Sequence, residues 1–185
     1  VQLATRRAAL GLATTEQTAA RLSKLGCAAI RIFSGVGLST QECTNLGRIP
    51  LRQGNPFRVT SIGNLLHLKG FEFGLRAFAE FHMRFPTSEY WIMGDGPERK
   101  RLERLAWWLG VSEKVTFWGF LPRPQVLEKL AACDVLVHPS LHDSGGWVCL
   151  EAMAAGRPVV CLDLGGPAVE VSSESGFKIS AISPK

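Results

Sequence analysis

Short apolar runs alternate along the chain with longer segments in which apolar residues recur at helical spacing. The short runs predict strands at residues 8–14, 28–33, 57–62, 89–93, 114–118, 135–138 and 158–162. The longer segments predict helices, and in the helix over residues 70–85 we expect a stripe at every fourth position to face the core. It consists of Phe73, Ala77, Phe81 and Phe85, with Leu75, Phe78 and His82 beside them. This alternation predicts an α/β fold, with a parallel sheet covered by helices on both faces.

The stretch from 35 to 56 interrupts this alternation, because its glycines and prolines follow no period. We interpret it as an interdomain linker. It separates a short strand–helix–strand unit at 1–34 from a larger unit at 57–185. The chain begins with Val1 instead of Met, and it ends at Lys185 without a capping pattern. We therefore expect a fragment of a longer protein.

Composition and charge indicate which classes of binding partner to expect. A formal charge of +5 and a pI of about 9.2 favour anionic partners, whether phosphates, nucleic acid or an acidic membrane surface. No nucleic-acid-binding motif is recognisable, so we do not expect a nucleic-acid partner. The five cysteines form no Cys-x-x-Cys pair, which argues against a zinc site and a disulfide framework. Most of the cysteines stand in apolar runs and suit buried free thiols in a reducing cytosol, so we expect a cytoplasmic protein. No apolar run reaches the ~20 residues needed to span a bilayer.

Two loops that follow predicted strands have features of ligand-binding loops, since parallel sheets bind ligands beyond the carboxyl ends of their strands. The first runs from Gly63 through Asn64 to Lys69, where a helix start favours an anion and the ammonium group adds to it. The second contains Gly94 and Gly96, which allow a ligand to approach the backbone closely. Each loop alone is also consistent with an ordinary surface turn.

A third loop, residues 138–151, combines glycines with carboxylates. Gly145 and Gly146 leave successive N–H groups bare at a helix start, which forms an anion cradle. Asp143 precedes that helix and Glu151 lies inside it, and carboxylates are good acceptors for pairs of hydroxyls. The arrangement suits a ligand that joins hydroxyls to phosphates. In the alternative interpretation, Asp143 is only the N-cap of the helix and Glu151 is a surface residue.

Taken in order, these motifs resemble the C-terminal domain of glycosyltransferase family 4. The match covers about residues 57–171 and keeps the order and spacing of the family pattern. The matching segments are Gly63 with Lys69-Gly70, Gly94-Asp95-Gly96-Pro97, Val115-Thr116-Phe117-Trp118-Gly119, Pro139-Ser140, the pair Asp143 and Glu151, and Ala152-Met153-Ala154-Ala155-Gly156-Arg157-Pro158-Val159. The resemblance implies a Rossmann-like domain, the C-terminal half of a GT-B enzyme, with residues 1–34 a remnant of the N-terminal, acceptor-side domain.

The resemblance also implies roles for the site residues. Lys69 and Asp143 would be catalytic: Lys69 would hold the diphosphate of a nucleotide sugar, and Asp143 would contact hydroxyls of the transferred sugar. Glu151 would bind the ribose. The other residues expected to contact the donor are Gly63, Asn64, Gly94, Gly96, Ser144, Gly145, Gly146 and Trp147. Protein cations and helix dipoles would stabilise the departing diphosphate, so no metal ion or other cofactor is expected.

The chain departs from the family pattern at three places. Asn64 replaces the usual Arg after the first glycine; it can donate a hydrogen bond but carries no charge. Asp143 replaces the usual Glu and is shorter by one methylene. The usual Glu-Gly-Phe-Gly loop lacks its Phe, so we expect a more mobile loop at residues 144–146 unless Trp147 packs against it.

The activity implied is transfer of a hexose from a nucleoside-diphosphate sugar to a glycan or lipid-linked acceptor, with retention of configuration. Because most of the acceptor domain lies outside the 185 residues, we expect no transfer by this chain alone. A basic surface is compatible with peripheral association at the inner membrane face. Two alternatives remain. One is another GT-B enzyme, a nucleotide-sugar epimerase or a phosphorylase; the other is a noncatalytic homologue that binds a nucleotide or a partner protein, which Asn64 supports.

Overall fold

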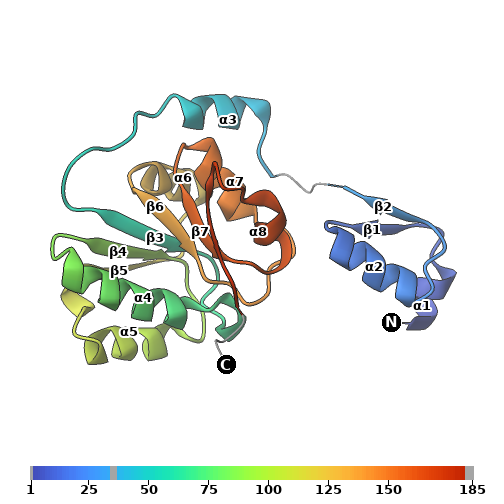
Figure 1. Cartoon of the computed structure of the whole chain (residues 1–185), viewed down its shortest axis with the longest axis horizontal. Helices are drawn as coiled ribbons and strands as arrows, with labels where there is room; N and C mark the ends of the chain where they lie inside the picture. Colours follow the sequence, from blue (N-terminus) through green and yellow to red (C-terminus); the bar gives the residue numbers. More distant parts are fainter. Residues whose placement is uncertain (1, 34–36, 182–185) are drawn as a thin grey trace.

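The computed structural model describes residues 2–33 and 37–181, and a small N-terminal unit precedes a larger C-terminal one (Figure 1). The elements of the smaller unit are α1 (Gln2–Arg7), β1 (Gly11–Ala13), α2 (Glu16–Lys24) and β2 (Ile30–Ile32). The strands β1 and β2 pair in parallel, as the strand–helix–strand pattern predicts, although both are shorter than predicted. Thr15 caps α2, because its hydroxyl accepts from the N–H of Thr18 at 3.1 Å.

Six parallel strands form the larger sheet, in the order β5-β4-β3-β6-β7-β8. They are β3 (Arg58–Ile62), β4 (Glu89–Met93), β5 (Val115–Gly119), β6 (Val135–His138), β7 (Val159–Leu162) and β8 (Gly176–Ile179). All of the strand pairs described in this sheet are parallel, which confirms the predicted sheet. Strands β3 to β7 begin and end within one residue of their predicted bounds.

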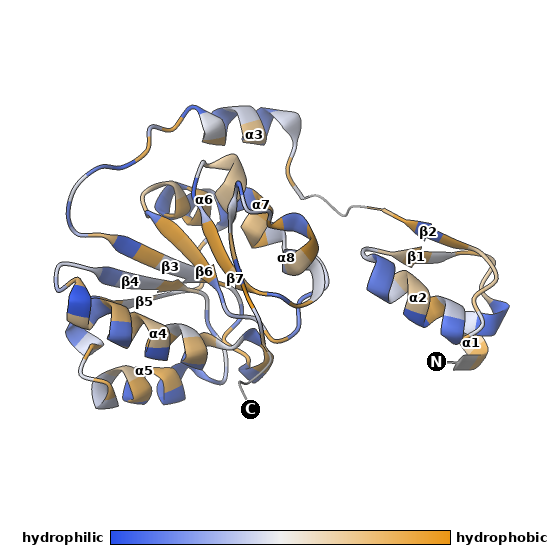
Figure 2. Cartoon of the chain, in the orientation of Figure 1, coloured by the Kyte–Doolittle hydropathy of each residue, from blue (hydrophilic) through white to orange (hydrophobic). Residues whose placement is uncertain are grey.

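Helices cover both faces of this sheet, which also confirms the predicted α/β architecture (Figure 1). One face carries α4 (Phe71–Arg84) and α5 (Arg99–Trp108); the other carries α6 (Arg123–Ala131), α7 (Trp147–Ala154) and α8 (Gly165–Glu170). Two short 3-10 helices, η1 (His67–Lys69) and η2 (Ser112–Lys114), precede α4 and β5. Strands β6 and β7 are largely apolar (Figure 2), and a separate apolar cluster fills each side of the sheet. None of the described helices is long and apolar enough to cross a lipid bilayer.

The order of the strands reverses next to β3. The chain proceeds from β3 outward to β4 and β5, and it then returns to place β6 on the other side of β3. At such a point, the loops after the two neighbouring strands turn to opposite faces and leave a crevice at the carboxyl edge of the sheet. These are the loop after Ile62, which leads to α4, and the loop after His138, which leads to α7. The topology therefore brings together the first and third of the predicted ligand loops.

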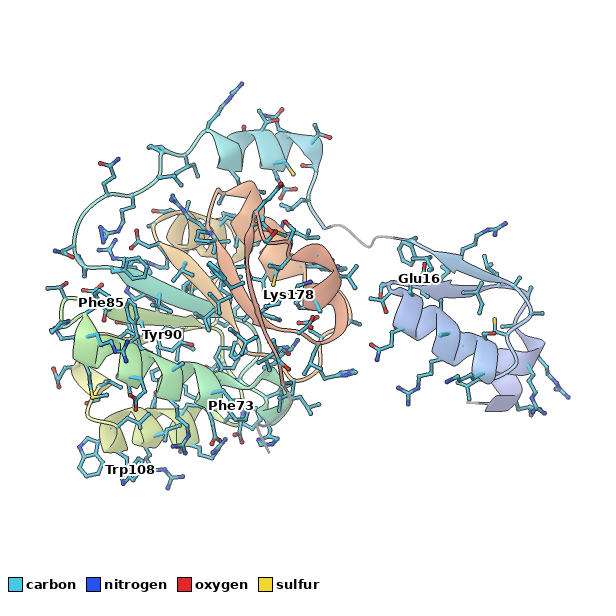
Figure 3. The ribbon with its side chains drawn as sticks, in the orientation of Figure 1. Glu16, Phe73, Phe85, Tyr90, Trp108 and Lys178 are labelled. Carbon is cyan, nitrogen blue, oxygen red and sulfur yellow. The ribbon has the colours of Figure 1, made fainter. Side chains whose placement is uncertain are left out.

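The predicted core face of α4 is confirmed only in part: Leu75 and Phe78 are buried and Phe81 is half-buried against the core, but three members of the stripe are exposed. Phe73 and Phe85 are 49% and 53% exposed (Figure 3), and Ala77 is also exposed. The buried residues of the helix are Phe71, Gly74, Leu75 and Phe78. A helix has 3.6 residues per turn, so a stripe chosen at strict fourth positions drifts around the helix and leaves the buried side.

A helix, α3 (Thr40–Gly47), lies within the stretch that we interpret as a linker. Ser39 and Glu42 form a capping box at its start: the Ser39 hydroxyl accepts from the N–H of Glu42 at 3.2 Å, and the Glu42 carboxylate accepts from the N–H of Ser39 at 2.8 Å. The helix packs against α7 and buries Leu46. With only eight residues between glycines and prolines, α3 is too short to show an apolar period in the sequence.

The sequence pattern also misses α8 and β8. Gly165 and Gly166 open α8, and glycine is a poor helix former, so this helix lacks a propensity signal. The strand β8 lies at the edge of the sheet, and three of its four residues are exposed, among them Phe177 at 70%. An edge strand that buries so little shows no apolar alternation.

The buried hydroxyl of Tyr90 generates a stability prediction. Tyr90 lies in the core between β4 and α4 (Figure 3), and its Oη is 2.7 Å from Ser61 Oγ. A Cβ atom on Gly74 would lie only 2.4 Å from the same Oη. We expect Gly74→Ala to lower the free energy of unfolding by ~1–3 kcal/mol, as overpacking does in other cores. In a Tyr90→Phe background the clashing atom is gone, so the same change should cost little.

Urea unfolding of the two single variants and the double variant measures this difference. An equal cost of Gly74→Ala in both backgrounds would mean that the hydroxyl is not what the glycine accommodates.

Candidate functional site

A pocket of about 470 Å³ opens at the carboxyl edge of the sheet, between the loop after β3 and the loop after β6. Its lining residues are Thr14, Ile62, Gly63, Asn64, Lys69, His138, Asp143, Ser144, Gly145, Gly146, Trp147, Val148 and Glu151. All of the predicted site residues except Gly94 and Gly96 are among them. The pocket therefore lies where the reversal of strand order leads us to expect a ligand.

Lys69 reaches the pocket from the end of η1, and the contact between the two loops determines its place. Gly70, the next residue, has φ of 64°, and a Cβ atom there would lie 2.0 Å from the carbonyl oxygen of Pro139. Only glycine allows the loops to pack this closely. Beside it, the N–H of Leu141 donates to the carbonyl of Leu68 at 2.9 Å. The first loop is thus attached to the third through backbone contacts.

Asp143 is the centre of the polar contacts in the pocket. Its Oδ2 accepts from Lys69 Nζ at 2.7 Å and lies 3.1 Å from His138 Nε2. Its Oδ1 accepts from the N–H groups of Gly145 and Gly146, each at 3.1 Å. The hydrogen bond with His138, and then those from Lys69 and the two N–H groups, hold the pKa of Asp143 well below its ordinary value, against the opposite effect of burial. The carboxylate is therefore ionised at neutral pH.

The expected cradle of bare N–H groups is smaller than predicted. Asp143 accepts from the N–H groups of Gly145 and Gly146, which precede α7, so these two groups are not bare. The N-cap of α7 is Gly146, and the alternative interpretation of Asp143 as the N-cap is therefore wrong. Within residues 2–33 and 37–181, the N–H groups of Trp147 and Val148 have no acceptor. These are the first two residues of α7, where the positive end of the helix dipole lies. An anion can bind there, next to Lys69.

The loop at residues 144–146 is held from two sides. A Cβ atom on Gly145 would lie 2.9 Å from Nε1 of Trp147, so the indole packs against the loop. The sequence predicts a mobile loop unless Trp147 packs against it, and the indole does so here. From the smaller unit, the Thr14 hydroxyl donates to the carbonyl of Ser144 at 3.0 Å.

Glu151 is buried on α7 and is not the surface residue of the alternative interpretation. Arg123, the first residue of α6, donates from Nη1 to Glu151 Oε1. Burial raises the pKa of Glu151, and the charge and hydrogen bond of Arg123 act against this effect. A carboxylate that keeps its charge in such a place is a strong acceptor for hydroxyl groups.

Two residues of this site, Arg123 and His138, are not predicted from the sequence. Arg123 lies 28 residues before Glu151, and between two prolines it looks like an ordinary helix start. His138 is buried at the end of β6 against Asp143, and the residues themselves suggest only a structural or surface role for it. Its position at the carboxyl end of a predicted strand is the signal that could have found it.

Gly94 and Gly96 lie behind the first loop instead of lining the pocket. A Cβ atom on Gly94 would lie 2.0 Å from the carbonyl oxygen of Gly63, and one on Gly96 would lie 2.6 Å from that of Leu65. The close approach that these glycines permit is therefore between two backbones, and their contact with a ligand stays a prediction. Asn64, by contrast, is exposed and lines the pocket.

A further carboxylate lies behind the glycine loop. Glu170 Oε2, from the end of α8, is buried and has no hydrogen-bond partner among the described residues. A Cβ atom on Gly146 would lie 2.6 Å from this oxygen. Burial, and then the charge of Asp143, raise the pKa of Glu170 to about 7.

The pocket can therefore bind a ligand that carries both an anionic group and hydroxyls. Lys69 and the start of α7 provide for the anion, and Asp143 and Glu151 provide acceptors for hydroxyls. In the described part of the chain, no group of three or more His, Cys, Asp and Glu side chains is placed to hold a metal ion.

A family model described as "Glycosyl transferases group 1" matches residues 45–182. The chain belongs to this family. The matched range contains every predicted site residue and both additional ones, Arg123 and His138. The match begins inside α3, so it includes no residue of the N-terminal unit.

Two relatives among characterised proteins illustrate the family. The 2-deoxystreptamine glucosyltransferase of Streptomyces kanamyceticus is 33% identical over 115 residues, which cover 62% of this chain and 30% of that protein. The lipopolysaccharide core biosynthesis glycosyltransferase LpsE of Rhizobium meliloti is 41% identical over 109 residues, which cover 59% of this chain and 30% of that protein. The matches thus span about a third of the length of these group 1 glycosyl transferases.

Two solved structures of longer chains have the same fold over nearly the whole of this chain. HepE from Anabaena, in complex with UDP, superposes with a TM-score of 0.77 at 27% identity, covering 97% of this chain and 52% of that one. Sucrose-phosphate synthase from Thermosynechococcus elongatus has a TM-score of 0.78 at 24% identity, covering 97% of this chain and 47% of that one. The second likeness concerns the fold alone. The chain spans about half of each structure.

The unpaired carboxylate of Glu170 predicts a pH-dependent effect on stability. Its pKa is about 7 in the folded chain against an ordinary value of 4.5, so the folded state favours the protonated form. The stability that this group contributes is present below pH 4.5 and is lost as the pH rises through 7. We expect Glu170→Gln to raise the melting temperature clearly at pH 8 and much less at pH 4.

Thermal unfolding at both pH values measures this effect. Glu174→Gln, at an exposed position in the turn between α8 and β8, is the matched control. A gain for Glu170→Gln that does not depend on pH would contradict the explanation.

Proposed function

We propose that the chain is the donor-binding half of a retaining hexosyltransferase of family 4, which transfers a hexose from a nucleoside-diphosphate sugar to a glycan or lipid-linked acceptor. One observation carries the proposal: the pocket joins an anion site to two carboxylates. Lys69 and the start of α7 form the anion site, and Asp143 and Glu151 provide the carboxylates. A nucleotide sugar has the matching chemistry, a diphosphate between two rings that carry hydroxyls.

Donor binding requires an exchange of partners at Lys69. In the free protein this side chain is paired with Asp143. A diphosphate competes for the ammonium group, and it gains the N–H groups of Trp147 and Val148. When Lys69 turns to the phosphates, Asp143 Oδ2 keeps its contact with His138 and can accept from a hydroxyl of the sugar in place of Lys69. One movement thus prepares the contacts to both parts of the donor.

The same groups stabilise the leaving diphosphate during transfer. As the bond between the anomeric carbon and the phosphate oxygen breaks, negative charge grows on the diphosphate, beside Lys69 and the positive end of α7. Asn64 can add a hydrogen bond but no charge. We infer retention of configuration, and chemistry without a metal ion or other cofactor, from the resemblance to family 4.

Several comparisons support the classes of donor and acceptor. HepE from Anabaena has been solved with UDP and with UDP-glucose, which supports a nucleoside diphosphate as the ligand and makes UDP the first to test. The name of LpsE supports a glycan or lipid-linked acceptor. With a formal charge of +5, we propose a cytoplasmic protein able to associate peripherally with an acidic membrane face.

The proposed division of the chain follows from the same assignment. Residues 1–34 are taken as part of the acceptor-side domain, 35–56 as the linker and 57–185 as the donor domain. The hydrogen bond from Thr14 to Ser144 supports this division, because it places the smaller unit at the edge of the donor pocket.

A noncatalytic homologue that binds nucleotides is the second candidate, and Asn64 is the observation that favours it. Among the described residues, no contact in the pocket favours an epimerase or a phosphorylase over a transferase. Turnover distinguishes the two remaining candidates, because both predict binding of a nucleotide.

Loss of the Lys69 ammonium group should weaken binding of the diphosphate. We expect Lys69→Ala to reduce the affinity for UDP by ~1–3 kcal/mol, or about 5–150-fold, as for loss of a charge-assisted hydrogen bond. Calorimetric titration of the 185-residue chain with UDP, GDP and ADP measures this. Lys100→Ala, an exposed lysine on α5, serves as the control for a change in net charge. Equal affinities of Lys69→Ala and the parent would refute the role of Lys69.

The Asp143 carboxylate should be needed for transfer itself. In a protein that includes the complete acceptor domain, we expect Asp143→Ala to lower kcat/KM by about 10–150-fold, because a charged acceptor for the sugar hydroxyls is lost. The measurement is the initial rate of transfer from the nucleotide sugar whose nucleotide binds in the titration. Unchanged turnover in the variant would count against the role of Asp143, and no turnover by the unaltered protein would favour the noncatalytic candidate.

A further inference from the structure

Arg123 lies where three segments of the chain meet, and it contacts all of them. Its Nη1 donates to Glu151 on α7, and its Nη2 donates to the carbonyl of Gly37 at 3.1 Å. Nη2 also lies 3.3 Å from Oε1 of Glu42, near the start of α3. These contacts leave the guanidinium group little freedom to turn, although the side chain is 45% exposed. Arg123 is therefore held between Glu151 on α7 and the segment that contains Gly37 and Glu42.

The partner that lies deepest is Glu151, whose side chain is only 11% exposed. A carboxylate in such surroundings needs a cation and hydrogen bonds to stay ionised. Among the described residues, Arg123 is its one hydrogen-bond partner, through Oε1. The orientation of the carboxylate toward the pocket therefore depends on this contact, and Oε2 is left for hydroxyls.

Other charged groups around α7 act elsewhere or in the opposite direction. The elements packed against α7 include α3, α6, α8 and β6. Glu42 on α3 raises the pKa of Glu151 by repulsion, as burial does more strongly, and only Arg123 lowers it. His138 on β6 lowers the pKa of Asp143, and the charge of Asp143 raises the pKa of Glu170 on α8. Neither His138 nor Glu170 is a cause of the pKa shift at Glu151. The ionised state of Glu151 thus relies on Arg123.

We propose that Arg123 is a positioning residue of the donor site, which orients Glu151 to accept from the ribose hydroxyls of the bound nucleotide. The proposal rests on the proposed function, and it adds a residue to the site that touches no substrate itself. Arg123 acts on the ribose alone, because its contacts do not extend to Lys69 or to the start of α7, where the diphosphate binds.

Three probes separate the ribose from the phosphates in a titration of the 185-residue chain: UDP, 2′,3′-dideoxyuridine diphosphate and inorganic pyrophosphate. We expect Arg123→Gln to weaken UDP binding about tenfold at pH 6, the loss of a charge-assisted contact. The weakening should be smaller at pH 9, where Glu151 ionises more readily, and the part that remains there reflects the lost orientation of the carboxylate. Binding of the dideoxy analogue and of pyrophosphate should be nearly unchanged, which also shows that the variant is folded.

Two further variants complete the experiment. Arg123→Lys keeps the charge and should restore part of the UDP affinity at pH 6. Arg76→Gln removes a half-exposed arginine from an ion pair with Glu72 on α4, outside the pocket, and should bind UDP as the parent does.

Each other outcome overturns a stated part of the argument. If Arg123→Gln lowers the affinity for all three probes equally at every pH, Arg123 only supports the fold. If the parent binds UDP and the dideoxy analogue with the same affinity, the nucleotide site stands and the ribose role of Glu151 and Arg123 is wrong. If the parent binds no nucleotide, the proposed function fails first.

Discussion

The carboxylate of Asp143 joins the two loops that leave the sheet where the order of its strands reverses. Strands β3 and β6 are neighbours, so the loops after them face each other across the carboxyl edge. One loop brings Lys69, the end of β6 brings His138, and the entry to α7 brings the N–H groups of Gly145 and Gly146. Four donors on a single carboxylate hold the start of α7 against the loop of Lys69. The shape of the pocket depends on this contact.

The charges of the pocket are held in pairs until a ligand arrives. Lys69 is paired with Asp143, and Arg123 with Glu151, so neither carboxylate is left uncompensated. The two pairs differ in what a nucleotide sugar would do to them. A diphosphate must separate the first pair to reach Lys69, whereas a ribose can bind to Glu151 while Arg123 stays in place. The pocket would therefore rearrange at its sugar–phosphate end and remain preorganised at its ribose end.

Prediction from the sequence succeeds for elements that are buried, because their apolar residues form a recognisable pattern along the chain. Strands β3 to β7 are apolar runs between helices, and their bounds are predicted within one residue. Prediction fails where an element buries little or is short, as with β8 at the sheet edge and α3 between glycines. On α4 the helix is predicted correctly but its buried side only in part. Leu75 and Phe78 are buried, whereas Phe73 and Phe85 are exposed, because the position of neighbouring elements selects the side. Local signals, such as the capping box at Ser39 and Glu42, can find α3 without a period.

The sequence by itself determined the fold class, the loops of the candidate site and most of its residues, because these depend on apolar alternation and on motifs that are local in the chain. Only the tertiary structure decided which of these residues meet. It placed Gly94 and Gly96 behind the pocket, brought His138 to Asp143, and set Arg123 beside Glu151. Contacts of this kind join residues on different elements, and they form only when the return of the chain to β6 sets those elements side by side. The pairing of side chains from different elements, and the removal of water from around them, arise only in the folded chain. No local pattern in the sequence encodes them.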